Sequence, residues 1–194
     1  TNTLGQDLFA GIGIGSRFSL IFAIVVSAIN LTIGAIYGAI QGYYGGKIDL
    51  VMDRISDILS AVPFIVVATL FQLHLAQRVG TVGSFLFAFM LTGWIGMAAL
   101  TRKQFYRFKN QEFVYAARTL GASDKRLMFK HIFPNSLGTI VTSCALIIPN
   151  VVNTETTLTY LGIVNLMDLV GTSIGTLLSQ GQTSMTTSPH AMFF

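Results

Sequence analysis

The chain has 194 residues, of which 52% are hydrophobic and only 10% are charged, and its formal net charge at pH 7 is +4. Charged residues make up about 25% of a typical soluble domain, so this composition excludes an ordinary soluble protein and indicates an integral membrane protein. Most of the positive charge lies in one segment between apolar segments, so it indicates membrane topology rather than binding to nucleic acid.

The first apolar segment follows a glycine-rich stretch, residues 1–17, that is too short to cross a membrane. Residues 18–46 carry no charge. A membrane span needs about 20 apolar residues, and we therefore predict a span at residues 18–40. Small residues at every fourth position allow a neighbouring helix to approach closely, either as static packing or as a moving interface. The candidate packing residues are Gly34, Gly38 and Gly42.

A more polar stretch follows, in which Asp49, Asp53 and Asp57 recur at every fourth residue. On a helix they would share one face, where three carboxylates are a possible metal site. The stretch has no His and no bend to close a coordination shell, so we interpret the aspartates as a solvated face. Arg54 is placed to pair with Asp57 three residues later.

Two further uncharged segments predict spans at residues 58–77 and 82–101, with a short turn at residues 78–80 between them. Pro63 should kink the first of these spans or mark its start, because proline lacks the backbone N–H that a helix interior needs. A fourth span is predicted at residues 137–154. Residues 158–194 are then expected to form an outer loop with a short interfacial helix at residues 174–178.

Polar side chains occur near the end of the fourth predicted span. Such side chains are costly at membrane depth unless they face a bundle interior or a water-filled path. We interpret them as candidate lining of a translocation pathway, and the alternative is that they lie in the outer headgroup region. These residues are Asn150, Asn153 and Glu155.

Residues 102–135 carry eight of the 12 Lys and Arg residues and only two acids, which gives the segment a net charge of +6. Because Lys and Arg are retained on the cytoplasmic side, the segment is predicted to be a cytoplasmic loop. By alternation, residues 47–54 lie inside, and residues 1–17 and 78–80 lie outside. The sequence therefore predicts an all-α, multi-pass membrane protein with a single transmembrane domain, residues 1–194.

The cytoplasmic loop has the pattern of two short helices joined by a tight turn. Gly121 permits the left-handed conformation of such a turn. Ser123 is suited to accept from the free N–H groups of the second helix, and Asp124 suits that helix's positive end. Pro134 should disrupt or kink continuation into the next span. The apolar residues at helical spacing on one face of the first helix are Phe113, Ala116, Ala117 and Leu120.

This loop resembles the EAA loop of ABC-importer permeases. The resemblance rests on Tyr115-Ala116-Ala117, on Gly121, and on an ending, His131-Ile132-Phe133-Pro134-Asn135, that is similar to the oligopeptide/dipeptide (peptide/nickel) branch. Tyr115 stands where the family typically has Glu, and Phe133 where Leu is usual. The run GYYGGKIDLVMDRISDILSAVPF at residues 42–64 resembles a signature block of the same branch, and shorter motifs at residues 5–7, 15–20 and 159–162 extend the resemblance over nearly the whole chain.

The resemblance implies the type I ABC importer transmembrane fold, which has six spans. The chain would hold the second to the fifth, about four of six, and would be part of a longer polypeptide. In that family the loop is the coupling element, and its short helix docks on a cytoplasmic ATPase. The candidate coupling residues are Tyr115, Ala116, Ala117, Gly121, Ala122, Ser123, Asp124, Lys125, His131, Pro134 and Asn135.

The resemblance further implies a transport subunit, similar to the second (C-type) permease, rather than an enzyme. The implied cargo is oligopeptides or dipeptides, although permeases for nickel or another small solute share much of the pattern. The chain would bind no cofactor, and ATP and Mg would sit on partner ATPases. The implied partners are a homologous permease, two ABC ATPases, an extracellular or periplasmic substrate-binding protein and the bilayer. The implied location is the cell membrane of a bacterium or archaeon.

Other functions fit the residues less well. Ala117 and Gly121 have the spacing of a DNA-binding helix–turn–helix, but the adjoining spans would keep the unit out of a major groove. An intramembrane protease needs its catalytic groups within the spans, whereas the aspartates lie at a cytoplasmic end. A secondary transporter needs intramembrane ionisable groups, for which only Glu155 is placed. A merely positive loop does not require the Ala-Ala-x-x-x-Gly…Pro-Asn framework.

Overall fold

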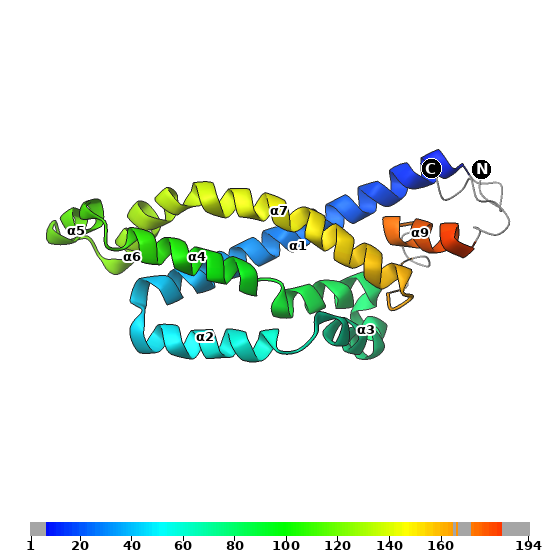
Figure 1. Ribbon diagram of the computed structural model, residues 1–194, viewed down its shortest axis with the longest axis horizontal. Coiled ribbons are helices and arrows are strands. Elements are labelled where there is room, and N and C mark those ends of the chain that lie inside the picture. Colours follow the sequence, from blue (N-terminus) through cyan, green and yellow to red (C-terminus); the bar gives the residue numbers. More distant parts are fainter. Residues whose placement is uncertain (1–6, 165, 167–171, 184–194) are drawn as a thin grey trace. The chain divides into compact units, whose positions relative to one another are not determined.

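The computed structural model describes residues 7–164, 166 and 172–183, and every regular element among them is a helix (Figure 1). Residues 5 and 6 of the N-terminal motif, and residues 165, 167–171 and 184–194 of the predicted outer loop, lie outside this described part. The elements are α1 (Leu8–Tyr44), α2 (Gly46–Ser60), α3 (Phe64–Thr92), α4 (Ile95–Phe108), α5 (Glu112–Thr119), α6 (Asp124–Arg126), η1 (Leu127–Ile132), α7 (Phe133–Tyr160) and α9 (Ile174–Thr183).

The chain divides into two compact units, and we describe each by itself. The first unit consists of Thr1–Val26, Phe64–Ala88 and Ile148–Phe194. The second consists of Ser27–Pro63 and Phe89–Ile147, and it contains the whole of the predicted cytoplasmic loop.

Three helical stretches in the described part are long and apolar enough to cross a membrane, namely Leu8–Tyr44, Phe64–Phe108 and Asp124–Tyr160. The predicted spans at residues 18–40 and 137–154 fall inside the first and third stretches. Those at residues 58–77 and 82–101 fall largely inside the second, although residues 58–60 belong to α2. The number of membrane crossings therefore stays a prediction.

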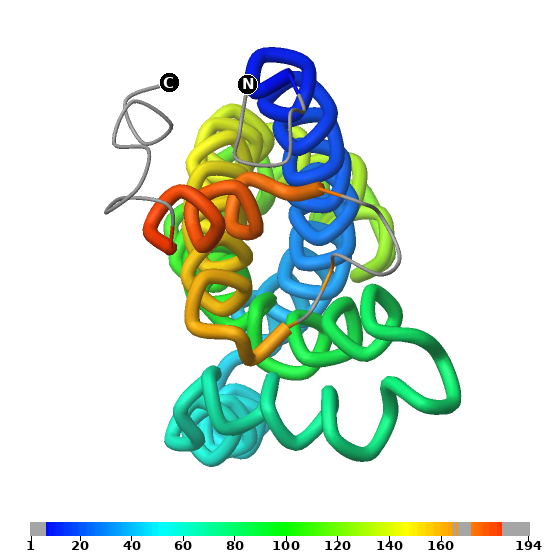
Figure 2. The backbone as a smooth tube through the Cα atoms, turned by 90° about the vertical axis from the view of Figure 1, so that its right-hand side faces the viewer, coloured from blue at the N-terminus to red at the C-terminus, as the bar shows by residue number. Residues whose placement is uncertain are grey.

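Helix ends and breaks follow from proline and glycine. Pro63 directly precedes α3 and so marks its start, as its missing N–H requires. The predicted turn at residues 78–80 is present as a break inside α3, where Gly80 has a φ of 78° and the chain changes direction (Figure 2). Gly45 and Gly46, with φ of 66° and 55°, separate α2 from α1. These left-handed conformations are open to glycine and strained for residues with a Cβ.

The first unit joins the beginning of α1 to α3, α7 and α9. Phe22 of α1 stacks on Phe85 of α3 with ring centroids 5.1 Å apart. The helix predicted at residues 174–178 is present as α9, and it packs closely on α7. A Cβ added to Gly175 would lie 2.7 Å from Cβ of Thr159.

The second unit is built on a close approach between α1 and α4, along the predicted stripe of small residues. A Cβ added to Gly34 would lie 2.7 Å from Cβ of Met97, and one added to Gly42 would lie 2.6 Å from Cβ of Phe105. At Gly38 it would collide with the carbonyl oxygen of Ala98. The stripe therefore lets the backbones of the two helices touch, as small residues do between membrane helices.

Replacement of Gly38 by alanine should destabilise the protein, because the added methyl group meets backbone atoms that cannot rotate away. We expect Gly38→Ala to lower the free energy of unfolding by about 1–3 kcal/mol. Gly138→Ala in α7 is the matched control, because a Cβ there meets nothing within 4 Å. Since alanine favours helix over glycine by about 1 kcal/mol, the control should be neutral or stabilising. Thermal unfolding in detergent measures both, and equal midpoints for the two variants would contradict the packing argument.

Candidate functional site

The loop between α4 and α7 folds as two short helical segments joined by a left-handed turn. Helix α5 ends where the N–H of Gly121 bonds to the carbonyl of Arg118 and that of Ala122 to the carbonyl of Ala117. Gly121 has a φ of 82°, as the predicted turn requires. Helix α6 then runs directly into η1, a wider π-helix of a kind that is rare and frequent at functional sites. We call residues 112–132 the loop pair.

A cluster of buried apolar side chains lies beneath the loop pair and fixes it to α1 and α4. From the loop pair come Val114, Leu127, Met128 and Ile132, and from α1 and α4 come Ala39, Tyr43 and Phe105. The predicted apolar face is largely wrong, because Val114 points inward, whereas Phe113, Ala116 and Leu120 are exposed. Ala117 and Ala122 pack against the edge of the cluster.

The opposite side of the loop pair exposes an apolar and basic surface. Leu120 is 88% exposed, far more than a large apolar residue in a folded core. Exposed apolar surface rimmed by polar residues is typical of an interaction site. The exposed residues of this outer face are Phe113, Tyr115, Leu120, Lys125, Arg126, Phe129 and Lys130.

Most of the remaining predicted coupling residues are exposed. Ala116, Gly121, Ser123 and Asp124 are exposed, as are Pro134 and Asn135 in the first turn of α7. His131 is half-buried, and its carbonyl accepts from the Asn135 amide at 2.6 Å. The predicted coupling residues therefore lie in the loop pair and in the first turn of α7.

The predicted side-chain cap at Ser123 is wrong. Ser123 does hold the extended N-cap conformation before α6, but its side chain makes no capping hydrogen bond. The first turn is closed by its backbone oxygen, which accepts from the N–H of Leu127 at 2.9 Å.

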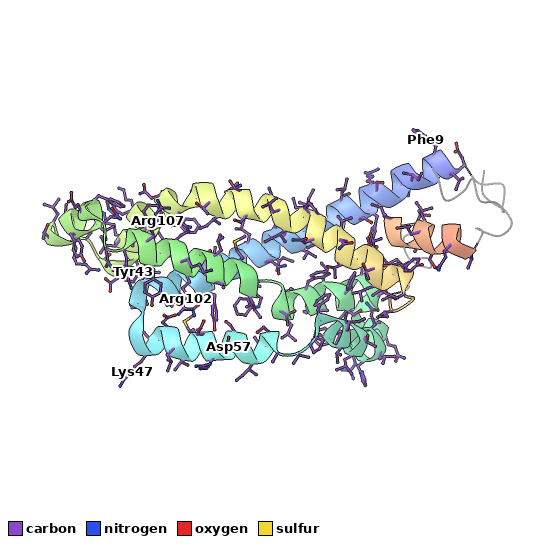
Figure 3. All side chains as sticks on the ribbon, viewed as in Figure 1. Phe9, Tyr43, Lys47, Asp57, Arg102 and Arg107 are labelled. Carbon is purple, nitrogen blue, oxygen red and sulfur yellow. The ribbon has the colours of Figure 1, made fainter. Side chains whose placement is uncertain are left out.

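The carboxylate of Asp124 reaches across to α1. The hydroxyl of Tyr43 donates to Asp124 Oδ1 at 2.5 Å, and Arg118 donates to the same hydroxyl oxygen at 3.3 Å. Figure 3 shows Tyr43 at the end of α1 nearest α5 and α6. The end of α1 is held a second time, because Lys109 Nζ donates to the carbonyl of Gly42 at 3.0 Å. A cation suits this position, where the last carbonyls of a helix lack partners.

Two of the three aspartates of α2 bind a cation of α4, so their interpretation as a solvated face is wrong. Arg102 donates to Asp49 Oδ2 at 2.7 Å and to Asp53 Oδ1 at 2.8 Å. The Tyr106 hydroxyl also donates to Asp49 Oδ2, at 2.5 Å. Asp49 is buried as a result, and Figure 3 shows Arg102 between α4 and α2. Only Asp57 behaves as predicted, in an exposed pair with Arg54 at 3.1 Å.

The surroundings of Asp49 favour its charged form. Burial raises the pKa of this carboxyl, but the hydrogen bond from Tyr106 and the hydrogen bond and charge of Arg102 outweigh burial. The pKa of Asp49 therefore lies below its ordinary value of 3.8. Among the described residues, no group of three or more His, Cys, Asp or Glu side chains is arranged to hold a metal ion.

The predicted pathway residues separate onto different faces of α7. Asn150 and Asn153 are exposed, whereas Glu155 is fully buried within the first unit. Ser19 donates to Glu155 Oε2 at 2.8 Å and Thr159 to Oε1 at 3.3 Å, so the carboxylate is bound within the unit. The assignment of these residues to a translocation pathway stays a prediction.

Sequence reasoning missed the residues that hold the loop pair and α2 in place, Tyr43, Arg102 and Tyr106. One signal was available. Arg102 and Tyr106 are four residues apart, as are Asp49 and Asp53, so each pair shares a helix face, and their chemistry is complementary. The sequence alone does not show that these two faces meet.

Comparison with protein families matches residues 30–193 to the family described as binding-protein-dependent transport system inner membrane component. The chain is 40% identical over 194 residues to the oligopeptide transport system permease protein OppC of Bacillus subtilis (strain 168), covering 100% of this chain and 62% of the relative. It is 36% identical over 163 residues to the dipeptide transport system permease protein DppC of the same organism, covering 84% and 50%. It is 37% identical to an OppC of Haemophilus influenzae, covering 100% and 61%. The chain thus spans about half to three fifths of these relatives' length.

Replacement of Asp49 by asparagine should weaken the attachment of α2 to α4, because Arg102 loses a charged partner while its side chain stays largely covered. At pH 7 we expect Asp49→Asn to lower the free energy of unfolding by about 1.5–3 kcal/mol. Asp57→Asn removes an exposed partner of Arg54 and should change it by less than about 0.5 kcal/mol. Thermal unfolding of the purified protein compares the two variants, and equal effects would contradict the assigned pairing.

The stabilisation that Asp49 provides should depend on pH. Folding lowers the pKa of Asp49, so the unfolded chain binds this proton more tightly than the folded chain does. The stabilisation is therefore fully present above the ordinary pKa of 3.8 and is lost as the pH falls through the lower folded-state pKa. The difference in unfolding midpoint between the unmodified protein and Asp49→Asn should shrink as the pH is lowered from 7 to about 3. A difference that stays constant would contradict this assignment.

Proposed function

Because the chain belongs to the family of binding-protein-dependent transport system inner membrane components, we propose that it is a permease subunit of an ABC importer that moves oligopeptides or dipeptides into the cell. The chain is an all-helical integral membrane protein of this family, with the type I importer fold and three helical stretches able to cross a membrane. Curated relatives at 36–40% identity are named as oligopeptide and dipeptide permeases, which favours peptide cargo over nickel or another small solute.

The observation that carries the proposal is the outer face of the loop pair. Residues 112–132 are anchored by a buried apolar cluster on one side and expose large apolar and basic side chains on the other. A surface that served only to fix topology would need positive charge alone. Exposure of Leu120 and Phe129 beside Lys125 and Lys130 instead suits a partner with an apolar groove and an acidic rim.

That partner is proposed to be a cytoplasmic ATPase subunit. ATP and Mg would bind to two such ATPases, and this chain would hydrolyse nothing itself. A homologous permease would complete the membrane path, and a substrate-binding protein outside the membrane would deliver the peptide. When the ATPase pair closes on ATP, it would push the loop pair. Helices α4 and α7, which continue from either end of the loop, would tilt and alternate access between the two sides.

A site-specific crosslink tests the docking. In the full-length protein, Cys144, the only cysteine of this chain, is replaced by Ala and a single cysteine is placed at Ser123, whose side chain makes no capping bond. We expect it to crosslink to cysteines in the docking groove of co-expressed ATPase subunits, with a yield that changes when ATP is added. Lys47→Cys at the exposed start of α2 is the control and should give no crosslink (Figure 3). A folded complex without a Ser123→Cys crosslink would overturn the ATPase docking.

The turn at Gly121 provides a second test of coupling. A Cβ at Gly121 meets nothing within 4 Å, so a substitution acts only through the left-handed backbone, at a cost of about 1–3 kcal/mol for a β-branched residue. We expect Gly121→Val to lower peptide uptake per ATP hydrolysed by about tenfold. Gly121→Asn should stay close to the unmodified protein, because asparagine tolerates this conformation. Uptake and hydrolysis are measured together in proteoliposomes, and equal coupling in the two variants would contradict the assignment.

A further inference from the structure

Tyr43 connects elements that are far apart in the sequence. It lies in the last turn of α1, with its ring buried in the cluster beneath the loop pair. Its hydroxyl emerges from that cluster, where it donates to Asp124 at 2.5 Å and accepts from Arg118 at 3.3 Å. A single side chain of α1 therefore contacts polar groups of both halves of the loop pair, α5 and α6.

These polar contacts differ in kind from the packing around them. The hydrophobic effect that drives apolar packing is not directional. A short hydrogen bond to a carboxylate is directional and is about twice as strong as a neutral one. Tyr43, Asp124 and Arg118 therefore add directional bonds between the loop pair and α1 to the packing of the apolar cluster.

The chain itself joins the loop pair only to α4 and α7. Force applied to the outer face would pass through the backbone into those two helices. Helix α1 would receive it through non-covalent contacts, with α4 along the glycine stripe and with the loop pair at the end of α1. Among the described contacts between the loop pair and α1, those that the Tyr43 hydroxyl makes with Asp124 and Arg118 involve charged side chains. Lys109 supports these contacts from the other side, by holding the carbonyl of Gly42 one residue before Tyr43.

We propose that Tyr43 is a positioning residue that locks the loop pair to α1, so that α1 moves together with α4 and α7 when the loop pair is pushed. This inference rests on the proposed function, because the force comes from the docked ATPase. On this inference α1 is a third helix that receives the force from the ATPase, and the hydroxyl group of Tyr43 connects it to the loop pair.

Tyr43→Phe removes that hydroxyl and leaves the buried ring in place. In the complete transporter in proteoliposomes, we expect Tyr43→Phe to lower peptide uptake per ATP hydrolysed by about ten- to a hundredfold, in the range expected for one hydrogen bond to a charged group. Hydrolysis itself should continue. Tyr44→Phe makes the same change at the next residue, which is 50% exposed, and should leave the ratio unchanged. A purely structural role would change the unfolding midpoint and the amount of complex, but not this ratio.

Variants of Asp124 test the hydrogen-bond partner of Tyr43. Asp124 is exposed, so its replacement does not disturb a buried position. Asp124→Ala should lower the ratio of uptake to hydrolysis, and the double variant should be no worse than Tyr43→Phe alone, since Tyr43→Phe already removes the bond to Asp124. Asp124→Asn keeps an oxygen that can accept from Tyr43, so its ratio should lie between those of the unmodified protein and Asp124→Ala. Additive effects of Tyr43→Phe and Asp124→Ala, or an unchanged ratio in Tyr43→Phe, would overturn the inference. The Ser123→Cys crosslink reports on docking separately, so a crosslink with an unchanged ratio refutes only the role of Tyr43.

Discussion

The buried apolar cluster beneath residues 112–132 is the interaction on which the rest of the second unit depends. Helix α5 has 8 residues, α6 has 3 and η1 has 6. Isolated helices shorter than about 12 residues are marginal in water, so none of these would persist alone. Burial of Val114, Leu127 and Ile132 supplies the missing stability, at about 1.5–3 kcal/mol for each large apolar side chain. Burial of the inner face offsets the unfavourable exposure of apolar side chains on the outer face.

The cluster in turn depends on the glycine stripe. Tyr43 and Ala39 of α1 meet Phe105 of α4 because the two backbones touch along the stripe of Gly34, Gly38 and Gly42. Larger residues on the stripe would separate the two helices and disrupt the surface of α1 and α4 on which the loop pair packs. The same approach brings α4 to the end of α1, where Lys109 reaches the terminal carbonyls. Close packing between membrane helices and the geometry of the cytoplasmic loop are thus parts of one arrangement.

Local features of this fold could be predicted from the sequence, whereas long-range partners could not. Glycine and proline set local features through their own backbone properties. They account for the turn at Gly121, the break at Gly80 and the start of α3 after Pro63. The partners of Asp49 and Asp124 depend on which helix faces meet, and spacing along the chain carries no information on that. The motif indicated which loop could couple to a partner, but helical spacing placed Phe113 and Leu120 on one apolar face, and the structure exposes both and buries Val114 instead. Helical periodicity gives a stripe but does not decide between adjacent residues at its edge.

The cations of residues 102–135 have two different roles, which the net charge of the segment does not distinguish. Retention of Lys and Arg on the cytoplasmic side accounts for their number, but the structure distributes them between different tasks. Arg102, Lys109 and Arg118 bind groups within the chain and hold α2, α1 and Tyr43 in place. Lys125, Arg126 and Lys130 are exposed on the outer face. The charge available to a partner is therefore smaller than the net +6 of the segment. It lies partly on α4, where Lys103 and Arg107 are exposed, and partly on α6 and η1, which also expose Phe129.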